Sequence, residues 1–172
     1  MVWFVRHAQV TLELDRPAST WRLSDEGREA AEELARRLAP VPRVFSSPEE
    51  KAQATAEPLA RLSGIPVEVD ERLREVERAA NLPDAAAHRE AVRVYLAGGR
   101  IDGWEPQVEA RRRFAAALES IDQAAVVTHA TVLALFLGYG FEEWARIALP
   151  DVIEWDRPPG EGSPPTGPPP TI

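Results

Sequence analysis

Two short apolar runs stand out in the pattern of hydrophobic and polar positions, and a histidine follows each of them. Residues 2–5 precede Arg6 and His7, and residues 124–127 lead to His129. Uninterrupted short apolar runs are typical of strands buried on both faces of a parallel sheet. Ligands of such sheets bind beyond the carboxyl ends of the strands. The pattern therefore predicts that both histidines and Arg6 lie together at one edge of a sheet.

Residues 25–38 carry the apolar period of a helix. Ala31 and Leu34 fall on one stripe of this helix, which we expect to pack on the sheet. Ser24 directly precedes the segment and belongs to the residue types that cap helix N-termini. Prolines follow the segment, so both of its ends are marked.

A second helix is indicated after a short strand at 44–45. Ser47 is expected to cap this helix, and Glu50 is expected to complete a capping box with it. Such a start places Lys51 in the first turns of the helix, just past the carboxyl end of a strand. Lys51 would then lie at the same sheet edge as the two histidines.

Proline and glycine punctuate the rest of the pattern. Pro58 is expected to kink or split the second helix, and Gly64 to end it. Polar loops are expected at 9–22 and 70–83. The remaining elements are expected to be strands at 65–69 and 151–155 and helices at 84–97 and 105–121. Alternating strands and helices predict a three-layer α/β/α domain with a mainly parallel sheet over residues 1–156.

Composition narrows the possible functions. The chain has 172 residues, no cysteine and a net charge of −8. The lack of cysteine excludes thiolate nucleophiles and cysteine metal sites, and the acidic balance argues against general nucleic-acid binding. No apolar run approaches the ~20 residues that span a membrane, so we expect a cytoplasmic protein. The run 111–113 is expected to be a solvated arginine face, and residues 157–172 a Pro/Gly-rich tail without a core. Nothing in the pattern indicates an oligomeric state.

Histidines beside cationic residues suit the transfer of a phosphoryl group. A histidine can serve as the nucleophile and carry the phosphoryl group covalently. The protein must then place cations around the phosphoryl oxygens and an acid near the leaving oxygen. Arg6, His7, Lys51 and His129 could meet for this purpose, together with one acid from 70–78.

At these residues the sequence resembles the histidine phosphatase superfamily, also called the phosphoglycerate-mutase-like family. The opening Arg-His-Gly of that family corresponds to residues 6–8, and its Leu-Thr-x-x-Gly to residues 23–27. Its Ser-Ser-Pro-x-x-Arg-Ala-x-x-Thr-Ala run corresponds to residues 46–56, its Leu-x-Glu to residues 73–75, and its second His-Gly to residues 129–130. The matches keep the order and spacing of the family across about residues 2–155.

The resemblance implies a role for each matching residue. His7 would be the phosphorylated nucleophile, and Glu75 would protonate the leaving group and later activate water. Arg6, Lys51 and His129 would bind the phosphoryl oxygens, and His129 would belong to the catalytic set. Glu77 is the alternative acid because it lies close to Glu75 in the sequence. No metal or other cofactor is implied, and the substrate would be a small phosphorylated molecule or a phosphoprotein.

Two departures from the family pattern leave other functions open. Lys51, the only lysine of the chain, stands where the family has a phosphate-binding arginine, and the family's Gly-x-Trp-Glu-Gly is missing after Glu75. Lysine keeps the charge but lacks the bidentate fork of arginine. The leading expectation is phosphomonoester hydrolysis. The alternatives are a weakened member that binds a phosphorylated ligand or a partner protein, and a phosphoglycerate-type mutase. His88 matches no motif and is expected to be exposed.

Overall fold

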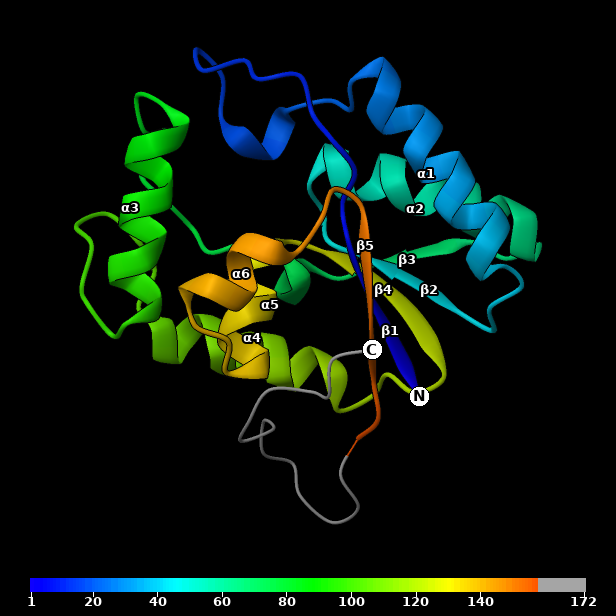
Figure 1. Ribbon diagram of the computed structural model, residues 1–172. Helices are drawn as coiled ribbons and strands as arrows, with labels where there is room; N and C mark the ends of the chain where they lie inside the picture. Colours follow the sequence, from blue (N-terminus) through cyan, green and yellow to red (C-terminus); the bar gives the residue numbers. More distant parts are fainter. Residues whose placement is uncertain (158–172) are drawn as a thin grey trace.

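A five-stranded sheet forms the centre of the protein, whose computed structural model describes residues 1–157 (Figure 1). The tail expected over 157–172 therefore lies outside the described residues, apart from Arg157. The strands are β1 (Val2–Arg6), β2 (Val44–Ser46), β3 (Val67–Val69), β4 (Ala124–Thr128) and β5 (Asp151–Trp155). The helices are α1 (Asp25–Leu38), α2 (Glu50–Ser63), α3 (Ala85–Leu96), α4 (Gln107–Leu118), α5 (Ala130–Leu137) and α6 (Phe141–Arg146), with short 3-10 turns at Ala18–Thr20 and Glu71–Leu73.

The strand order is β3-β2-β4-β1-β5, and only β5 runs antiparallel to its neighbour. The predicted mainly parallel sheet is therefore confirmed. The two histidine-bearing strands β1 and β4 are direct neighbours, and their register pairs Arg6 with Thr128. The residues that follow these two positions, His7 and His129, therefore emerge side by side at the carboxyl edge of the sheet.

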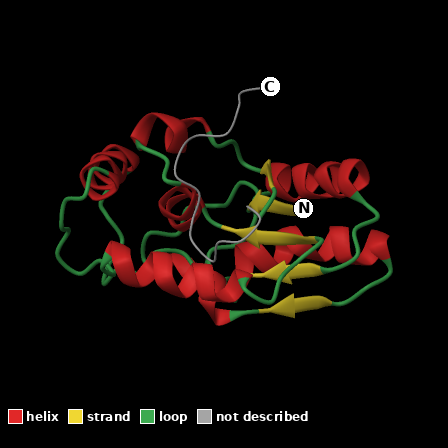
Figure 2. Ribbon diagram, turned by 90° about the horizontal axis from the view of Figure 1, so that it is seen from below, coloured by secondary structure: helices red, strands yellow, loops and turns green. Residues whose placement is uncertain are grey.

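Helices cover both faces of the sheet, which confirms the three-layer architecture (Figure 2). Alternate side chains of β1 divide between two cores because successive strand residues point to opposite faces. Val5 packs with residues of α1 and α2, whereas Phe4 packs with residues of α4 and α5, including Phe114 and Phe136. The two buried faces hold β1 rigidly, so the residues that follow it are projected from a fixed support.

The bounds of α1 agree with the sequence pattern. Ser24 caps the helix by accepting a hydrogen bond from the Gly27 N–H at 3.0 Å. A Cβ atom on Gly27 would lie 2.0 Å from the carbonyl oxygen of Gln9. Glycine at this position therefore allows α1 to approach the chain just after His7.

The start and the middle of α2 differ from the prediction. Ser47 does not cap this helix, because its N-cap is Glu49 and the Ser47 hydroxyl instead contacts His129. Pro58 does not split α2, which is continuous from Glu50 to Ser63. Packing of α2 on α1 and the sheet holds the helix across the missing hydrogen bond, since tertiary contacts supply most helix stability. Gly64 ends the helix in the left-handed conformation, as predicted.

The prediction of a solvated arginine face is wrong for Arg113. Its side chain is only 12% exposed and pairs with Glu105 at 2.7 Å. It also donates to the carbonyl oxygens of Arg72, Arg74 and Glu75, each at 2.8–2.9 Å. Arg113 therefore holds the loop that carries the candidate acid against α4.

None of the helices within residues 1–157 is long and apolar enough to cross a membrane.

Candidate active site

The carboxyl ends of three neighbouring strands bring the two histidines and Ser47 together. The His7 N–H donates to the Thr128 carbonyl oxygen and the Ser47 N–H to the Val127 carbonyl oxygen, each at 3.0 Å. The ring centroids of His7 and His129 lie 5.2 Å apart. Both imidazoles are buried. The predicted meeting of the two strand–histidine units at one sheet edge is therefore observed.

The hydrogen bond of His7 defines which of its ring nitrogens carries a proton. Its Nδ1 lies 2.8 Å from the carbonyl oxygen of Ala8. A carbonyl oxygen can only accept, so Nδ1 is the protonated nitrogen and Nε2 carries the lone pair in the neutral ring. Burial, followed by the nearby His129 and Lys51, holds the pKa of His7 well below its usual value. The ring is therefore neutral at physiological pH, with an unprotonated Nε2.

Thr55 supports the backbone beside His7. Its hydroxyl accepts from the Ala8 N–H at 3.0 Å and donates to the Lys51 carbonyl oxygen at 2.7 Å. A single side chain thus ties the strand end that carries His7 to the first turns of α2. Thr55 therefore contributes to the site by holding the backbone beside His7, although its side chain does not reach the centre of the site.

His129 presents one nitrogen to the protein and leaves the other unpartnered. Its Nε2 lies 2.8 Å from the Ser47 hydroxyl, whereas its buried Nδ1 has no hydrogen-bond partner among the described residues. Burial and the charge of Lys51 lower the pKa of His129 to about 3. A buried polar atom without a partner is costly unless a ligand satisfies it. Nδ1 is therefore a candidate contact for a bound oxygen.

The two expected cations lie in the same cavity as the histidines, which has a volume of about 260 Å³. Arg6 donates one N–H to the Ile147 carbonyl oxygen, and its buried Nε has no partner among the described residues. Burial lowers the pKa of Arg6, but an arginine remains charged in proteins. Lys51 is only 5% exposed, so it does not face solvent. Its ammonium donates to the Ala18 carbonyl oxygen at 2.6 Å.

Glu49 is a buried carboxylate that no sequence motif indicates. One of its oxygens pairs with the Lys51 ammonium. The other accepts from the Glu75 N–H at 2.9 Å and lies 3.4 Å from His129 Nε2. The acid lies two residues before Lys51 at a helix start, where a carboxylate is ordinary, so no signal in the local sequence marks it. Glu49 places a negative charge among the groups expected to bind phosphate.

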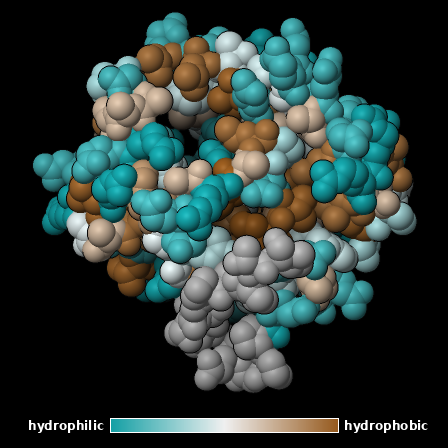
Figure 3. Space-filling view, viewed as in Figure 1, coloured by the Kyte–Doolittle hydropathy of each residue, from teal (hydrophilic) through white to brown (hydrophobic). Residues whose placement is uncertain are grey.

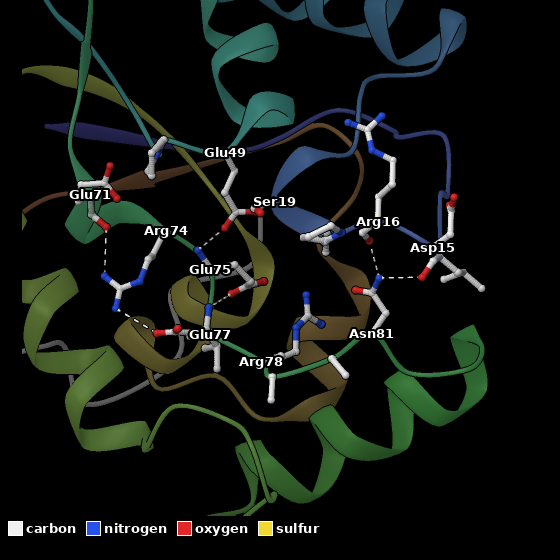
Figure 4. Close-up of a pocket in the computed structure, with 17 residues that line it drawn as sticks. Asp15, Arg16, Ser19, Glu49, Glu71, Arg74, Glu75, Glu77, Arg78 and Asn81 are labelled. Atoms are coloured by element: carbon white, nitrogen blue, oxygen red, sulfur yellow. Dashed lines mark hydrogen bonds and ion pairs between the residues drawn. The ribbon is translucent and has the colours of Figure 1, made fainter.

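Glu75 faces this cluster, whereas Glu77 does not. The Glu75 carboxylate accepts from the backbone N–H groups of Val76, Thr131 and Val132 at 2.8–3.1 Å. Burial opposes its ionisation, but His129, Arg78 and these N–H groups outweigh burial and lower its pKa. The side chain of Glu77 is 73% exposed. Figure 4 shows Glu49 and Glu75 converging from separate segments.

Arg78 and His88 form a second pair at the edge of the site. Arg78 lines both the 260 Å³ cavity and a neighbouring cavity of about 690 Å³ that is shown in Figure 4. Its guanidinium lies 3.1 Å from His88 Nδ1. The expectation that His88 is exposed is wrong, because its ring packs between Trp104 and Trp144. Burial, together with Arg78, lowers the pKa of His88 to about 4. Neutral His88 can therefore accept a hydrogen bond from Arg78.

The site suits a small anion with several oxygens. The unprotonated Nε2 of His7, two cations and the unpartnered Nδ1 of His129 lie at one cavity, and the N-terminus of α5 adds a favourable dipole. Within residues 1–157, no three histidine, aspartate or glutamate side chains gather in a way that would hold a metal ion.

Comparisons with known proteins give a family model and similar solved structures. The sequence model of the histidine phosphatase superfamily (branch 1) matches residues 2–153. A comparison with curated proteins finds no match. The structure of a mycobacterial glucosyl-3-phosphoglycerate phosphatase is similar, with a TM-score of 0.62 and 24% sequence identity, and the match covers 86% of this chain and 84% of that chain. A phosphoglycerate mutase from Bacillus anthracis matches with a TM-score of 0.65 and 19% identity over 79% of this chain and 77% of that chain. These two likenesses show a shared fold.

Proposed function

The chain belongs to the histidine phosphatase superfamily, and we propose that it hydrolyses phosphomonoesters through a phosphohistidine on His7. The observation that carries this proposal is the hydrogen bond from His7 Nδ1 to the Ala8 carbonyl oxygen. This bond fixes the tautomer in which Nε2 is free to attack phosphorus. The similarity to a phosphatase fold supports the same reaction class.

In the first step, His7 Nε2 forms a bond to phosphorus while the bond from phosphorus to the ester oxygen breaks. Arg6, Lys51 and the Nδ1–H tautomer of His129 would stabilise the charge on the phosphoryl oxygens. The departing alcohol oxygen takes a proton from Glu75. An approaching phosphate dianion raises the pKa of a nearby carboxyl group, which would load Glu75 with that proton.

In the second step, water attacks the phosphorus of phosphohistidine and the bond from nitrogen to phosphorus breaks. Glu75, now ionised, accepts a proton from that water as a general base. Inorganic phosphate leaves, and neutral His7 is restored. We propose that both steps proceed without a metal ion, since each charge has a side chain of this protein to balance it.

Turnover of a phosphomonoester panel by wild type and His7→Asn tests the proposal. We expect phosphate release by the wild type that persists after exhaustive chelation, and none by the variant. Arg112→Met, which changes an exposed arginine of α4, serves as the control and should retain activity. Activity that is lost on chelation and restored by a divalent ion would contradict the metal-free reaction. Including 3-phosphoglycerate in the panel also detects mutase activity as isomerisation.

The pairing of Glu49 with Lys51 favours a second candidate, a weakened member that binds a phosphorylated ligand or partner without turnover. In the free protein the Glu49 carboxylate already compensates the positive charge of Lys51, which would otherwise attract phosphate. Calorimetric binding of inorganic phosphate without turnover of any panel member would select this candidate. Binding with turnover selects the phosphatase.

A further inference from the structure

The cavity that contains the candidate catalytic groups is lined mostly by apolar side chains apart from those groups. Arg6, His7, Lys51 and His129 line one part of its 260 Å³. The rest of the wall is dominated by apolar side chains that come from the loop after β1, from the segment before α3, and from α6 and its following loop: Leu12, Leu14, Trp21, Leu82, Trp144 and Leu149. A phosphoryl group on His7 would therefore hold its ester group against these side chains.

Several of these apolar side chains are exposed to an unusual degree. Leu12 is 64% exposed, Leu14 50% and Leu149 39%, although large leucines usually bury most of their surface. Figure 3 shows apolar surface beside a hollow under the loop that follows β1. Exposed apolar side chains that gather at the mouth of a cavity are typical of a ligand site. Their position around a phosphate-binding centre identifies the ligand part they face as the ester group of the substrate.

Two polar side chains of this wall, Asn81 and Asp84, form hydrogen bonds within the protein. The Asn81 amide donates to the Arg16 carbonyl oxygen at 2.6 Å and to that of Leu14 at 3.2 Å. The Asp84 carboxylate caps α3 by accepting from the Ala87 N–H at 2.8 Å. A sugar would place most of its hydroxyl groups against the apolar side chains of the wall, where they would lose hydrogen bonds to water. An apolar group would lose none.

We propose that the substrate is a phosphomonoester of a compact apolar alcohol, such as an alkyl or aryl phosphate, and not a sugar phosphate. This inference rests on the proposed function of the same site. The ester group lies between the loop after β1 and α6, where it covers Leu12 and Leu14. Only atoms that lie against the apolar wall gain affinity, because atoms beyond it return to water.

A series of n-alkylphosphonates from methyl to hexyl tests the inference by calorimetry, because binding of these stable analogues needs no turnover. Affinity should rise by about two- to fourfold per methylene and then level off, where fourfold corresponds to about 0.8 kcal/mol for a fully buried methylene. Turnover of propyl phosphate and glycerol 3-phosphate compares two alcohols of matched length. We expect kcat/KM to be at least tenfold higher for the propyl ester.

Leu12→Ser and Leu14→Ser should flatten the chain-length dependence of phosphonate binding. Leu62→Ser is the matched control, since Leu62 is 43% exposed and lies on α2 away from the cavity; it should leave the dependence unchanged. Chain-independent affinity in the wild type, or tighter binding of the glycerol compound, overturns the apolar substrate. Failure of the proposed function is distinct: phosphonates then still bind with chain-length dependence, but no ester, including an activated aryl phosphate, is turned over.

Discussion

At the scale of single residues, the hydrogen bonds of the Glu75 carboxylate distinguish it from the exposed Glu77 as the candidate acid. The candidate acid must hold a proton during ester cleavage, yet three backbone N–H groups favour its ionised form in the free protein. In the proposed reaction, the substrate dianion therefore raises the pKa of Glu75 before the ester is cleaved. This requirement makes the role of Glu75 testable through the leaving group.

Glu75→Gln should slow the cleavage of an alkyl phosphate far more than that of an activated aryl phosphate. General acid catalysis contributes roughly 10²–10⁴ in rate and matters most for a poor leaving group. Steady-state kcat on the two substrates measures the difference. Glu77→Gln makes the same charge change two residues away and should alter neither rate. Equal losses on both substrates in Glu75→Gln would remove Glu75 from the role of acid.

Glu49→Gln should strengthen the binding of inorganic phosphate by about tenfold. The change removes a negative charge beside Lys51, and a charged hydrogen bond contributes about 1.5–3 kcal/mol, of which we expect roughly half to reach binding. The free variant should also be less stable, because Lys51 loses its buried counter-ion. Inhibition constants for phosphate and melting temperatures with and without phosphate measure both effects. Weaker phosphate binding would mean that Glu49 holds Lys51 in its binding position.

The motif residues could be predicted from the sequence, but their environment could not. Arg6, His7, Lys51 and His129 meet as expected, because parallel strand ends and a helix start bring them to one edge. The role of Glu49 could not be predicted, because local sequence does not show whether a carboxylate near a helix start faces solvent or a buried site. The burial of His88 could not be predicted for a similar reason, since only tertiary packing buries its ring.

At the scale of elements, the loop between β3 and α3 determines where the acid lies. The hydrophobic patterns that predict strands and helices do not predict the course of this loop. Arg113 of α4 holds it by donating hydrogen bonds to three of its carbonyl oxygens. The Arg78–Trp104 bridge supports the same segment. The position of Glu75 therefore depends on a helix that carries no catalytic motif.

Arg113→Met should lower the free energy of unfolding by about 3 kcal/mol and reduce kcat. Removing one partner of a buried ion pair costs about 3–5 kcal/mol, since it leaves Glu105 less well compensated. Urea denaturation and kcat on an alkyl phosphate measure the two losses. Arg112→Met, on the exposed face of the same helix, should stay within about 0.5 kcal/mol of wild type. Unchanged kcat in a destabilised Arg113→Met would show that the loop keeps its place without the clamp.

Strands and most helix bounds were predictable because burial on both faces and capping residues leave local signals. The bounds of α1 agree with the prediction residue by residue. The N-cap of α2 and the continuity of this helix through Pro58 could not be predicted from local sequence. Distant parts of the chain decide them, through the contact of Ser47 with His129 and the packing of α2 on α1.

At the scale of the whole molecule, buried neutral histidines make stability depend on pH. The pKa of His129 is about 3 in the folded protein, against an ordinary value near 6.5. The unfolded chain therefore binds more protons below about pH 6.5, so the free energy of unfolding falls as pH drops from that value toward 3. Between pH 7 and pH 5 one such histidine lowers the free energy of unfolding by about 2 kcal/mol.

His129→Gln should remove about 2 kcal/mol of this pH dependence, although it also lowers stability at neutral pH. Urea denaturation of the wild type and of His129→Gln at pH 7 and at pH 5 gives the free energy of unfolding that each protein loses over this interval. The difference between the two losses is the contribution of His129. The interval lies above the range in which most carboxylates titrate, so the histidines dominate it. An identical loss in both proteins would mean that His129 accepts a proton in the folded state.

The whole arrangement predicts one covalent species, a phosphoryl group on Nε2 of His7. Rapid quenching during turnover of an alkyl or aryl phosphate, followed by mass spectrometry of the peptide that contains residues 1–16, detects it directly. We expect an acid-labile, base-stable phosphate on His7 that forms within the first turnover and is absent from His7→Asn. Turnover without any such adduct, or a phosphoryl group on another residue, would contradict the account.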